Sequence, residues 1–539
     1  MIARIFIPAS VTELKDGWLG EIWSNISITI SSENLNYKNF ENKMIVVKSN
    51  PANDEFDSLI LFNCDVSELT WTLNCSQLAG CVYLKYVDFL YGSEFRDDRE
   101  NAFCRYSLES IQISATVNFF GPESFSDCSN LIIATFCEDS QLKSFMSGTF
   151  FNTSINEIFI PASIEELDDM CFNGMNFLKE ITISDKNKHF TFLDDEKRVV
   201  AAKSDPSNED YDVIVYAIRN IIKVVIPSFV RSIRPYAFSD CIKLIDIEFS
   251  EGSQLQSIGS SAFNMASFDE IVIPSHVNFI GEYAFNLCKN LNKIEFEKNS
   301  ELIEFNCNLF NESAFESISF PDNFPRLSDG WCFKTSYLNN IYLSPENKNF
   351  VFPDEKKILL GKCDVKNDVY IKIVFVCRDV KEVSIPPYIT NIGSSSFFNC
   401  LIERIKIPKS VNVIENSAFS NCKHLKFIEF EDGSESIFID ECSFRYISVE
   451  NLVIPAKRAI IEPTSFLSSE KIKIIEFLGE DLSLFSLVSN QSLLLYQFQM
   501  LKIFQFQNTP LLMFKKILHF FPMLGRILIN VNKRKCNEL

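Results

Sequence analysis

The chain has 539 residues, of which 46% are hydrophobic, so it is too long for a disulfide-held mini-protein and too apolar to be disordered throughout. Its 51 basic and 71 acidic residues give a net charge of −20, which argues against a nucleic-acid partner because phosphate backbones attract cationic surfaces. Neither of the glycine-rich nucleotide-binding loops, G-x-G-x-x-G or G-x-x-x-x-G-K-[ST], occurs in the sequence.

The N-terminal residues read MIARIFIPASVTEL, in which the apolar run is too short for a secretory signal peptide. Ile7 and Pro8 open a partial copy of a repeat that continues through most of the chain. We therefore expect the sequence to begin inside a repeat.

The repeat is clearest in three segments. Residues 226–249 read IPSFVRSIRPYAFSDCIKLIDIEF, residues 273–296 read IPSHVNFIGEYAFNLCKNLNKIEF, and residues 407–430 read IPKSVNVIENSAFSNCKHLKFIEF. Looser copies fill the gaps, which gives a rung of about 23 residues nested in a block of about 160 residues. Fixed aliphatic positions at this period predict a leucine-rich-repeat solenoid over residues 1–478.

Each rung is predicted to contribute one short strand at I-x-I/F, with its middle residue facing outward, so that successive strands form one long parallel sheet. The A-F-x-x-C segment is predicted to cross the convex side as a short helical turn. Phenylalanines in this slot are expected to stack as a buried column, formed by Phe238, Phe263, Phe285, Phe397, Phe419 and Phe444.

Insertions near residues 34–62, 185–222 and 345–381 separate the blocks, and their alternating pattern predicts β-hairpins. Asp194, Asp195 and Glu196 could form a cation site. The calcium-loop spacing is absent, however, so a solvated turn is the favoured interpretation.

The 17 cysteines are an odd number and include no C-x-x-C pair. Several recur in the slot three residues after the phenylalanine, which are Cys128, Cys241, Cys288, Cys400 and Cys422. Cysteines two rungs apart are too far apart for a disulfide, whose Cα atoms lie within about 7 Å. These residues are therefore predicted to be buried free thiols.

The repeated frame resembles the BspA-like leucine-rich-repeat family, most closely at residues 273–294 and 407–428. The family has a glycine after the second isoleucine, which Gly281 keeps and Arg234 and Glu415 replace. Because the family consists of surface proteins of bacteria and parasitic protists, the resemblance implies a solenoid with a role in surface display or adhesion to host proteins. It supplies no catalytic residues.

No catalytic constellation is predicted, and we expect no enzymatic activity, cofactor or metal site. The four histidines, His189, His276, His424 and His519, belong to separate segments, and a solenoid keeps such segments apart. The H-E-x-x-H and G-x-S-x-G signatures are missing from the sequence.

The outward-facing strand residues form the candidate protein-binding surface, which is predicted to be the concave face of the solenoid. Acidic and apolar residues alternate along it, although for any single position an ordinary solvated strand face is the alternative. The candidate residues are Phe159, Val225, Glu248, Val272, Glu295, Tyr342, Lys406, Glu429 and Val453.

Residues 479–539 break the pattern and form an apolar tail with 7 basic and 3 acidic residues. A cap for the array or an interfacial membrane-associated segment is the favoured interpretation. A membrane span at residues 511–531 is the alternative, which Lys515, Lys516 and Arg526 disfavour because charges are costly near the bilayer centre.

These observations predict a non-enzymatic protein-binding solenoid, acting in cell-surface adhesion or as a host-interaction antigen. The resemblance implies a host surface or matrix protein as partner. The alternative is an intracellular leucine-rich-repeat scaffold for protein–protein interaction, which free thiols and the lack of a visible leader favour.

Overall fold

Strands and turns make up the described part of the chain, and no helix occurs among its residues. The computed structural model describes residues 103–477, apart from 322–323, 325, 354–356, 364–368 and 463. It also describes residues 3–12, 26–40, 44–47, 58–62, 68–71, 85–89, 96–97, 481–484 and 504–506. The chain divides into two units, one of Met1–Asp246 with Ser250–Ala266 and one of Ile247–Phe249 with Ser267–Leu539.

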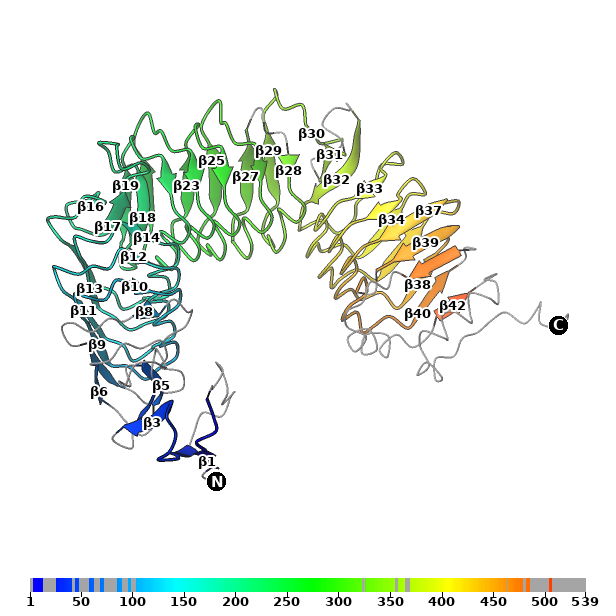
Figure 1. Ribbon diagram of the computed structural model, residues 1–539. Helices are drawn as coiled ribbons and strands as arrows, with labels where there is room; N and C mark the ends of the chain where they lie inside the picture. The colour runs from blue at the N-terminus through cyan, green and yellow to red at the C-terminus, as the bar shows by residue number, and fades with distance from the viewer. Residues whose placement is uncertain are drawn as a thin grey trace. The chain divides into compact units, whose positions relative to one another are not determined.

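The strands predicted at the I-x-I/F positions form a first row of parallel sheets in each unit (Figure 1). The six-stranded sheet of the first unit contains β6 (Glu68–Trp71), β7 (Tyr86–Phe89), β9 (Ser110–Ile113), β11 (Ile133–Phe136), β13 (Glu157–Ile160) and β15 (Glu180–Ile183). The four-stranded sheet of the second unit contains β23 (Glu270–Ile273), β25 (Lys293–Phe296), β27 (Ser317–Phe320) and β29 (Asn340–Leu343).

Shorter pieces complete the first row. They are β1 (Ala3–Ile7) with β2 (Ile26–Ile30), β34 (Arg404–Ile407) with β36 (Phe427–Phe430), and β38 (Asn451–Ile454) with β40 (Ile474–Phe477) and β42 (Phe504–Phe506). The strands β19 (Lys223–Ile226) and β21 (Asp246–Phe249) hold the same position in their rungs.

A second row of short parallel strands, which the sequence did not lead us to predict, lies just before the A-F segment. In the first unit it consists of β8 (Arg96–Asp97), β10 (Phe119–Phe120), β12 (Ser144–Phe145), β14 (Glu166–Leu167), β20 (Ser232–Ile233) and β22 (Ser257–Ile258). In the second unit it consists of β24 (Phe279–Ile280), β26 (Glu304–Phe305), β28 (Arg326–Leu327), β33 (Asn391–Ile392), β35 (Val413–Ile414), β37 (Ser436–Ile439), β39 (Arg458–Ile461) and β41 (Asp481–Leu484).

Each insertion is a three-stranded antiparallel unit. The strands are β3 (Tyr37–Phe40), β4 (Met44–Val47) and β5 (Ser58–Phe62), then β16 (Phe190–Phe192), β17 (Val199–Ala202) and β18 (Val213–Ala217), then β30 (Phe350–Val351), β31 (Ile358–Lys362) and β32 (Tyr370–Val376). The last strand of an insertion joins the second row, as β18 does with β20 and β32 with β33.

The first-row sheet is divided at the insertions. Among the described strands, β15 ends its sheet just before the second insertion, and β29 ends its sheet just before the third. The first row also ends and restarts between β36 and β38, where no insertion intervenes. The expected long parallel sheet is therefore a series of shorter sheets.

The A-F-x-x-C segment is a run of turns rather than the expected short helical turn. Tyr236, just before its Ala-Phe pair, has φ of 61°, and Asp240, two residues after the pair, has φ of 60°. Tyr283 and Leu287 hold the same positions two rungs later, and their φ values are 59° and 57°. Residues in the left-handed region interrupt a right-handed helix, so the backbone turns twice and leaves the phenylalanine pointing inward.

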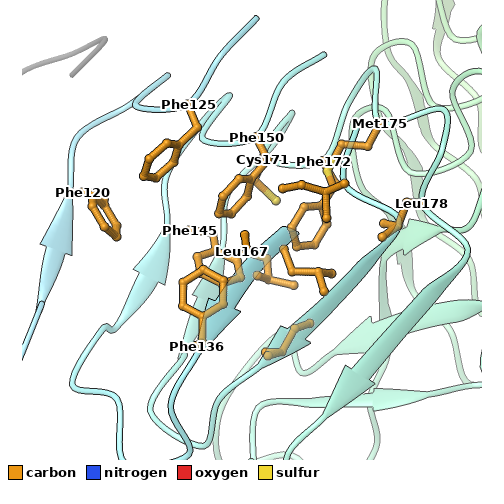
Figure 2. Packing of buried hydrophobic residues seen from close by; sticks show 14 of the residues in the cluster. Phe120, Phe125, Phe136, Phe145, Phe150, Leu167, Cys171, Phe172, Met175 and Leu178 are labelled. Carbon is orange, nitrogen blue, oxygen red and sulfur yellow. The ribbon is translucent and has the colours of Figure 1, made fainter. Parts of the chain in front are cut away.

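The phenylalanine column forms as predicted. Phe103, Phe125 and Phe150 stack nearly parallel in the first unit, with ring centroids 5.1 and 5.6 Å apart. Figure 2 shows Phe125, Phe150 and Phe172 following one another through successive rungs. The six residues singled out from the sequence are all fully buried, namely Phe238, Phe263, Phe285, Phe397, Phe419 and Phe444.

The cysteine slot serves the same core. The thiol of Cys128 donates a hydrogen bond to the carbonyl of Phe103 at 2.9 Å, and Cys422 repeats the bond to Phe397 at 2.9 Å. In each case the acceptor belongs to the preceding phenylalanine of the column. The thiol therefore joins adjacent rungs while it packs as a small apolar group.

A buried arginine anchors the third insertion to the core. Arg378 is 2% exposed, and its guanidinium donates to the carbonyls of Ser396 at 2.8 Å and Thr335 at 3.3 Å. The same group lies over the ring of Phe375, 4.6 Å from its centroid. Arg378 forms no ion pair with any described carboxylate, so backbone carbonyls and an aromatic face balance its buried charge.

Arg219 holds the equivalent place after the second insertion. It donates to the carbonyls of Ala217 and Ala237 and lies over the ring of Tyr216. The turn here is short, since nine residues lie between Ile214 and Val224, whereas thirteen lie between Ile233 and Ile247 in the next rung. The long arginine side chain fills the volume and supplies the donors that the missing residues would have supplied.

Replacing Phe285 with alanine tests the column. Phe285 stacks on Phe310 at 6.0 Å and is fully buried, so the variant should lose roughly 3–5 kcal/mol of unfolding free energy. The measurement is chemical denaturation, with hydrogen exchange to show that the loss is local to neighbouring rungs. Phe279→Ala is the matched control, because Phe279 is exposed in the same unit. If both changes destabilise the protein equally, the buried phenylalanine column does not make the stabilising contribution proposed for it.

Replacing Arg378 with methionine tests the anchor. The apolar stem is kept, but several buried carbonyls lose their donor, which should cost roughly 3 kcal/mol or more. Hydrogen exchange should then report early opening of residues 370–400. Arg458→Met, at an exposed arginine of the same unit, should leave exchange unchanged. Identical exchange in the two variants would show that the guanidinium does not stabilise the insertion.

Candidate functional site

The structure places all nine candidate residues at the outward middle position of first-row strands. Glu248, Lys406, Glu429, Val225, Val272, Tyr342 and Val453 are exposed, whereas Phe159 and Glu295 are partly buried. Their neighbours on each side along the strand point into the core, as the burial of Ile271 and Ile273 around Val272 illustrates.

The four-stranded sheet of the second unit brings the largest group of these positions together. Val272 is in register with Glu295, and Ser319 is in register with Tyr342. Adjacent parallel strands lie about 4.8 Å apart, so one side-chain column crosses β23, β25, β27 and β29. Val272 is 45% exposed and Tyr342 is 54% exposed, which puts an apolar side chain at each end of the column.

The first unit carries exposed apolar residues that the sequence reading missed. Ile222, Ile242 and Ile245 are all more than half exposed, and the amide of Ile245 donates to the carbonyl of Ile222. Val225 lies in the strand that follows Ile222, so the cluster adjoins a candidate residue. The sequence does mark Ile245 as unusual, because most other rungs have a polar residue at the equivalent position.

Nearby lysines partly neutralise the acidic members of the surface. Lys293 pairs with Glu295 at 2.8 Å, and Lys406 lies 3.8 Å from Glu429 and 3.0 Å from Glu431. Its hydrogen bond to Glu431 raises the pKa of Lys406 and lowers the pKa of Glu431. The surface is therefore mixed in charge rather than uniformly acidic.

A groove of about 690 Å³ lies where the third insertion meets the first-row strands of the second unit. Lys357 and Ile358 of the insertion line it on one side. Lys406 and Glu429, two of the candidate residues, line it on the strand side. The groove hollows the strand surface beside the third insertion.

A second cavity, of about 480 Å³, lies beside the same insertion and is polar. Lys372 lines it and is paired with Asp329 at 3.2 Å and Glu415 at 2.7 Å. Glu415 also accepts a hydrogen bond from the amide of Ser394. These ion pairs connect the third insertion to the solenoid, because Lys372 belongs to the insertion and both acidic residues belong to rungs.

The acidic turn considered as a cation site has a structural role. The carboxylate of Asp194 accepts hydrogen bonds from the amides of Arg198 and Val199, and Glu196 pairs with Arg198. Within the described chain, no group of three histidine, cysteine or acidic side chains is arranged to hold a metal ion.

The buried thiols have low nucleophilicity. Burial raises the pKa of the Cys128 thiol to about 12 and that of Cys400 to about 11. All described cysteines are free, and of these only Cys363 is exposed. Because the thiolate is the nucleophile, such shifts make the buried cysteines poor nucleophiles.

The basic tail at residues 479–539 falls almost wholly outside the described residues, including the alternative span at 511–531. In the part of the chain that is described, no helix is long and apolar enough to cross a membrane.

The sequence profile of the BspA type leucine rich repeat region matches in six copies, over residues 96–192, 213–350 and 372–478, which is more than half of the chain. The chain belongs to the BspA-type leucine-rich-repeat family. The repeat-solenoid fold and the family expected from the sequence are thus confirmed. Proteins of this fold are typically non-enzymatic binding scaffolds.

Several solved structures are similar to this BspA-type chain. The pneumococcal vaccine antigen PcpA is 19% identical, with a TM-score of 0.44 over 56% of this chain and 71% of its own. A leucine-rich repeat protein from Eubacterium ventriosum is 16% identical, with a TM-score of 0.46 over 76% and 94%. A leucine rich cell surface protein from Faecalibacterium prausnitzii is 18% identical, with a TM-score of 0.35 over 74% and 93%. No curated protein matches the sequence.

Alkylation of the native protein tests the state of the thiols. A short iodoacetamide pulse near pH 8 should modify Cys363 and spare Cys128, whose raised pKa lowers its thiolate fraction by about a thousandfold relative to a pKa of 9.0. Peptide mass spectrometry gives the extent at each site, and unfolding in urea should equalise the two. Equal labelling in the native state would contradict burial of Cys128.

Proposed function

We propose that this BspA-type solenoid is a non-enzymatic protein-recognition module, and that the strand surface is where it binds. The observation that carries the proposal is the register-aligned column from Val272 to Tyr342, which exposes apolar side chains on a rigid sheet. Apolar side chains that gather on one exposed face are typical of protein-interaction sites.

The chemistry of the surface suits a protein partner. Exposed aliphatic and tyrosine side chains supply area that a partner can bury, and tyrosine adds a hydroxyl for hydrogen bonding. The Lys293–Glu295 ion pair lies within the column, where a charged pair sets orientation more than affinity. Because the strands are fixed by the core, little conformational entropy is lost on binding.

We further propose that the protein works at a cell surface, in adhesion or host interaction. Membership of the BspA-type family supports a surface role, because the family that the sequence resembles consists of surface proteins. An epitope tag inserted between Glu209 and Asp210, two exposed residues of the second insertion, provides the test. Tagged cells should be labelled without permeabilisation.

An intracellular scaffold with the same recognition surface is the second candidate. The buried free thiols favour it, because no described cysteine depends on an oxidising compartment. Labelling of the tag only after permeabilisation would establish this candidate and exclude the surface role.

Two charge-introducing substitutions test the recognition surface. Val272→Asp and Tyr342→Lys change exposed side chains, so unfolding free energies should shift by no more than about 0.5 kcal/mol. Capture of intact host cells or of purified extracellular-matrix proteins by the immobilised full chain should fall at least about tenfold. Surface plasmon resonance and cell counting provide the measurements.

Matched controls lie away from the strand surface. Tyr337→Lys changes an equally exposed tyrosine in a turn, and Val369→Asp changes an exposed valine of the third insertion. Both variants should bind like the unmodified chain. If the controls abolish capture and the strand substitutions do not, the ligand is presented by the turns or insertions, and the proposed surface is wrong.

A further inference from the structure

We propose that the groove beside β34 binds an extended segment of the protein ligand through one carboxylate side chain, which pairs with Arg404. This inference rests on the recognition function proposed above and names a subsite and a ligand chemistry within it. The groove contains two of the nine candidate residues, Lys406 and Glu429, and it adds residues that the sequence did not single out.

The groove exists because one rung is a residue short. A single residue separates Cys400 from the buried Ile402, whereas two residues separate Cys422 from the buried Leu425 in the next rung. The turn fixes where the following strand begins, so its shortening changes how β34 meets the preceding rung.

The hydrogen-bonded ladder is open at this point. The amide of Glu403 still donates to the carbonyl of Lys381, but no further backbone hydrogen bond joins the described residues 382–385 to β34. Residues 382–385 accordingly form no strand, although the same segment is a strand in the equivalent rung of the preceding block. Glu382, Val383 and Ser384 line the groove together with Arg404 and Ile405.

Arg404 is held in a conformation that leaves its hydrogen-bonding edge available. Its guanidinium lies over the ring of Phe427, 5.4 Å from the centroid, and Phe427 is 59% exposed beside it in register. No described carboxylate forms an ion pair with Arg404. A guanidinium stacked on an aromatic face keeps its planar N–H fork free for a bidentate carboxylate.

The other charged groups of the groove narrow the ligand chemistry. Lys406 is neutralised by Glu429 and Glu431, whereas Arg404 forms no ion pair with a described carboxylate and can receive an incoming acidic side chain. Glu382 lines the same groove without an ion-pair partner among the described residues, and its charge disfavours a ligand with several adjacent carboxylates. Apolar contacts come from Phe427, from Val383 and, on the insertion side, from Pro353, which line the groove and are not buried.

The geometry therefore favours one acidic residue flanked by apolar residues in an extended chain. An extended segment places alternate side chains on one side, so a carboxylate on Arg404 puts the neighbouring apolar groups within reach of the insertion wall. A guanidinium–carboxylate bond of this kind adds to binding more than a neutral hydrogen bond does.

Two fluorescein-labelled hexapeptide pools test the assignment. Each has blocked ends and a mixture of Leu, Phe, Ser and Thr, with a single fixed Glu in one pool and Gln in the other. Fluorescence anisotropy on the full chain should show the Glu pool binding about tenfold more tightly, as expected for one charge-assisted pair. Arg404→Gln should remove this preference.

Arg458→Gln is the control, because Arg458 is an exposed strand arginine of the same unit outside the groove, and it should keep the preference. Equal binding of the two pools, or a preference that survives Arg404→Gln, would overturn the assignment. If that happens while Val272→Asp and Tyr342→Lys still abolish capture, the groove is excluded and the recognition surface stands. Loss of capture through the turn and insertion controls alone would instead exclude the surface, whatever the peptides show.

Discussion

The stacking of one phenylalanine on the next is the interaction on which the rest of the structure depends. A rung of about 23 residues has no interior of its own, so its aliphatic and aromatic side chains are buried only by the rungs on either side. The ring contacts between Phe397, Phe419 and Phe444, with centroids 4.6 and 5.2 Å apart, fix the spacing and the angle between rungs. The cysteine thiols and the short second-row strands follow from that spacing, since each needs a carbonyl at a set distance in the neighbouring rung.

The insertions interrupt this arrangement, because their extra strands separate successive rungs in both the first-row strand ladder and the phenylalanine column. At the second and third insertions an aromatic residue packs against an aromatic residue of a preceding rung, as Tyr216 does against Phe172 and Phe375 does against Trp331. The backbone around these residues is short of donors, and Arg219 and Arg378 provide them from a single side chain. A buried arginine is tolerable here because carbonyls and an aromatic face surround it, whereas an unpartnered charge in the same place would be strongly unfavourable.

Residues that recur at a fixed phase could be predicted from the sequence, and residues that occur at breaks in the phase could not. The buried phenylalanines and thiols were identified because the same identity returns in rung after rung. The second-row strands escaped notice because two residues of pairing leave too short a pattern to recognise. Left-handed residues such as Tyr236 carry no sequence mark, since tyrosine rarely adopts that conformation. Arg219 was passed over because arginine is normally a surface residue. On the candidate surface, the outward positions followed from strand alternation, but the ion pairs and the groove depend on side-chain geometry and rung length.

The division between constrained and free positions is the reason that we propose the strand surface as the recognition site. Inward strand positions and the phenylalanine and cysteine slots are fixed by packing, so they cannot vary without loss of stability. Most outward strand residues are exposed, as Val272 and Tyr342 are, so packing constrains them less and they can vary to suit a partner. The 22-residue rung beside β34 is an irregular feature of the array, and Arg404 lies over Phe427 there, which is why we propose a ligand subsite at this point. The array tolerates one irregular rung because the stability of each rung depends only on that rung and its neighbours. The effect of the irregularity therefore stays local.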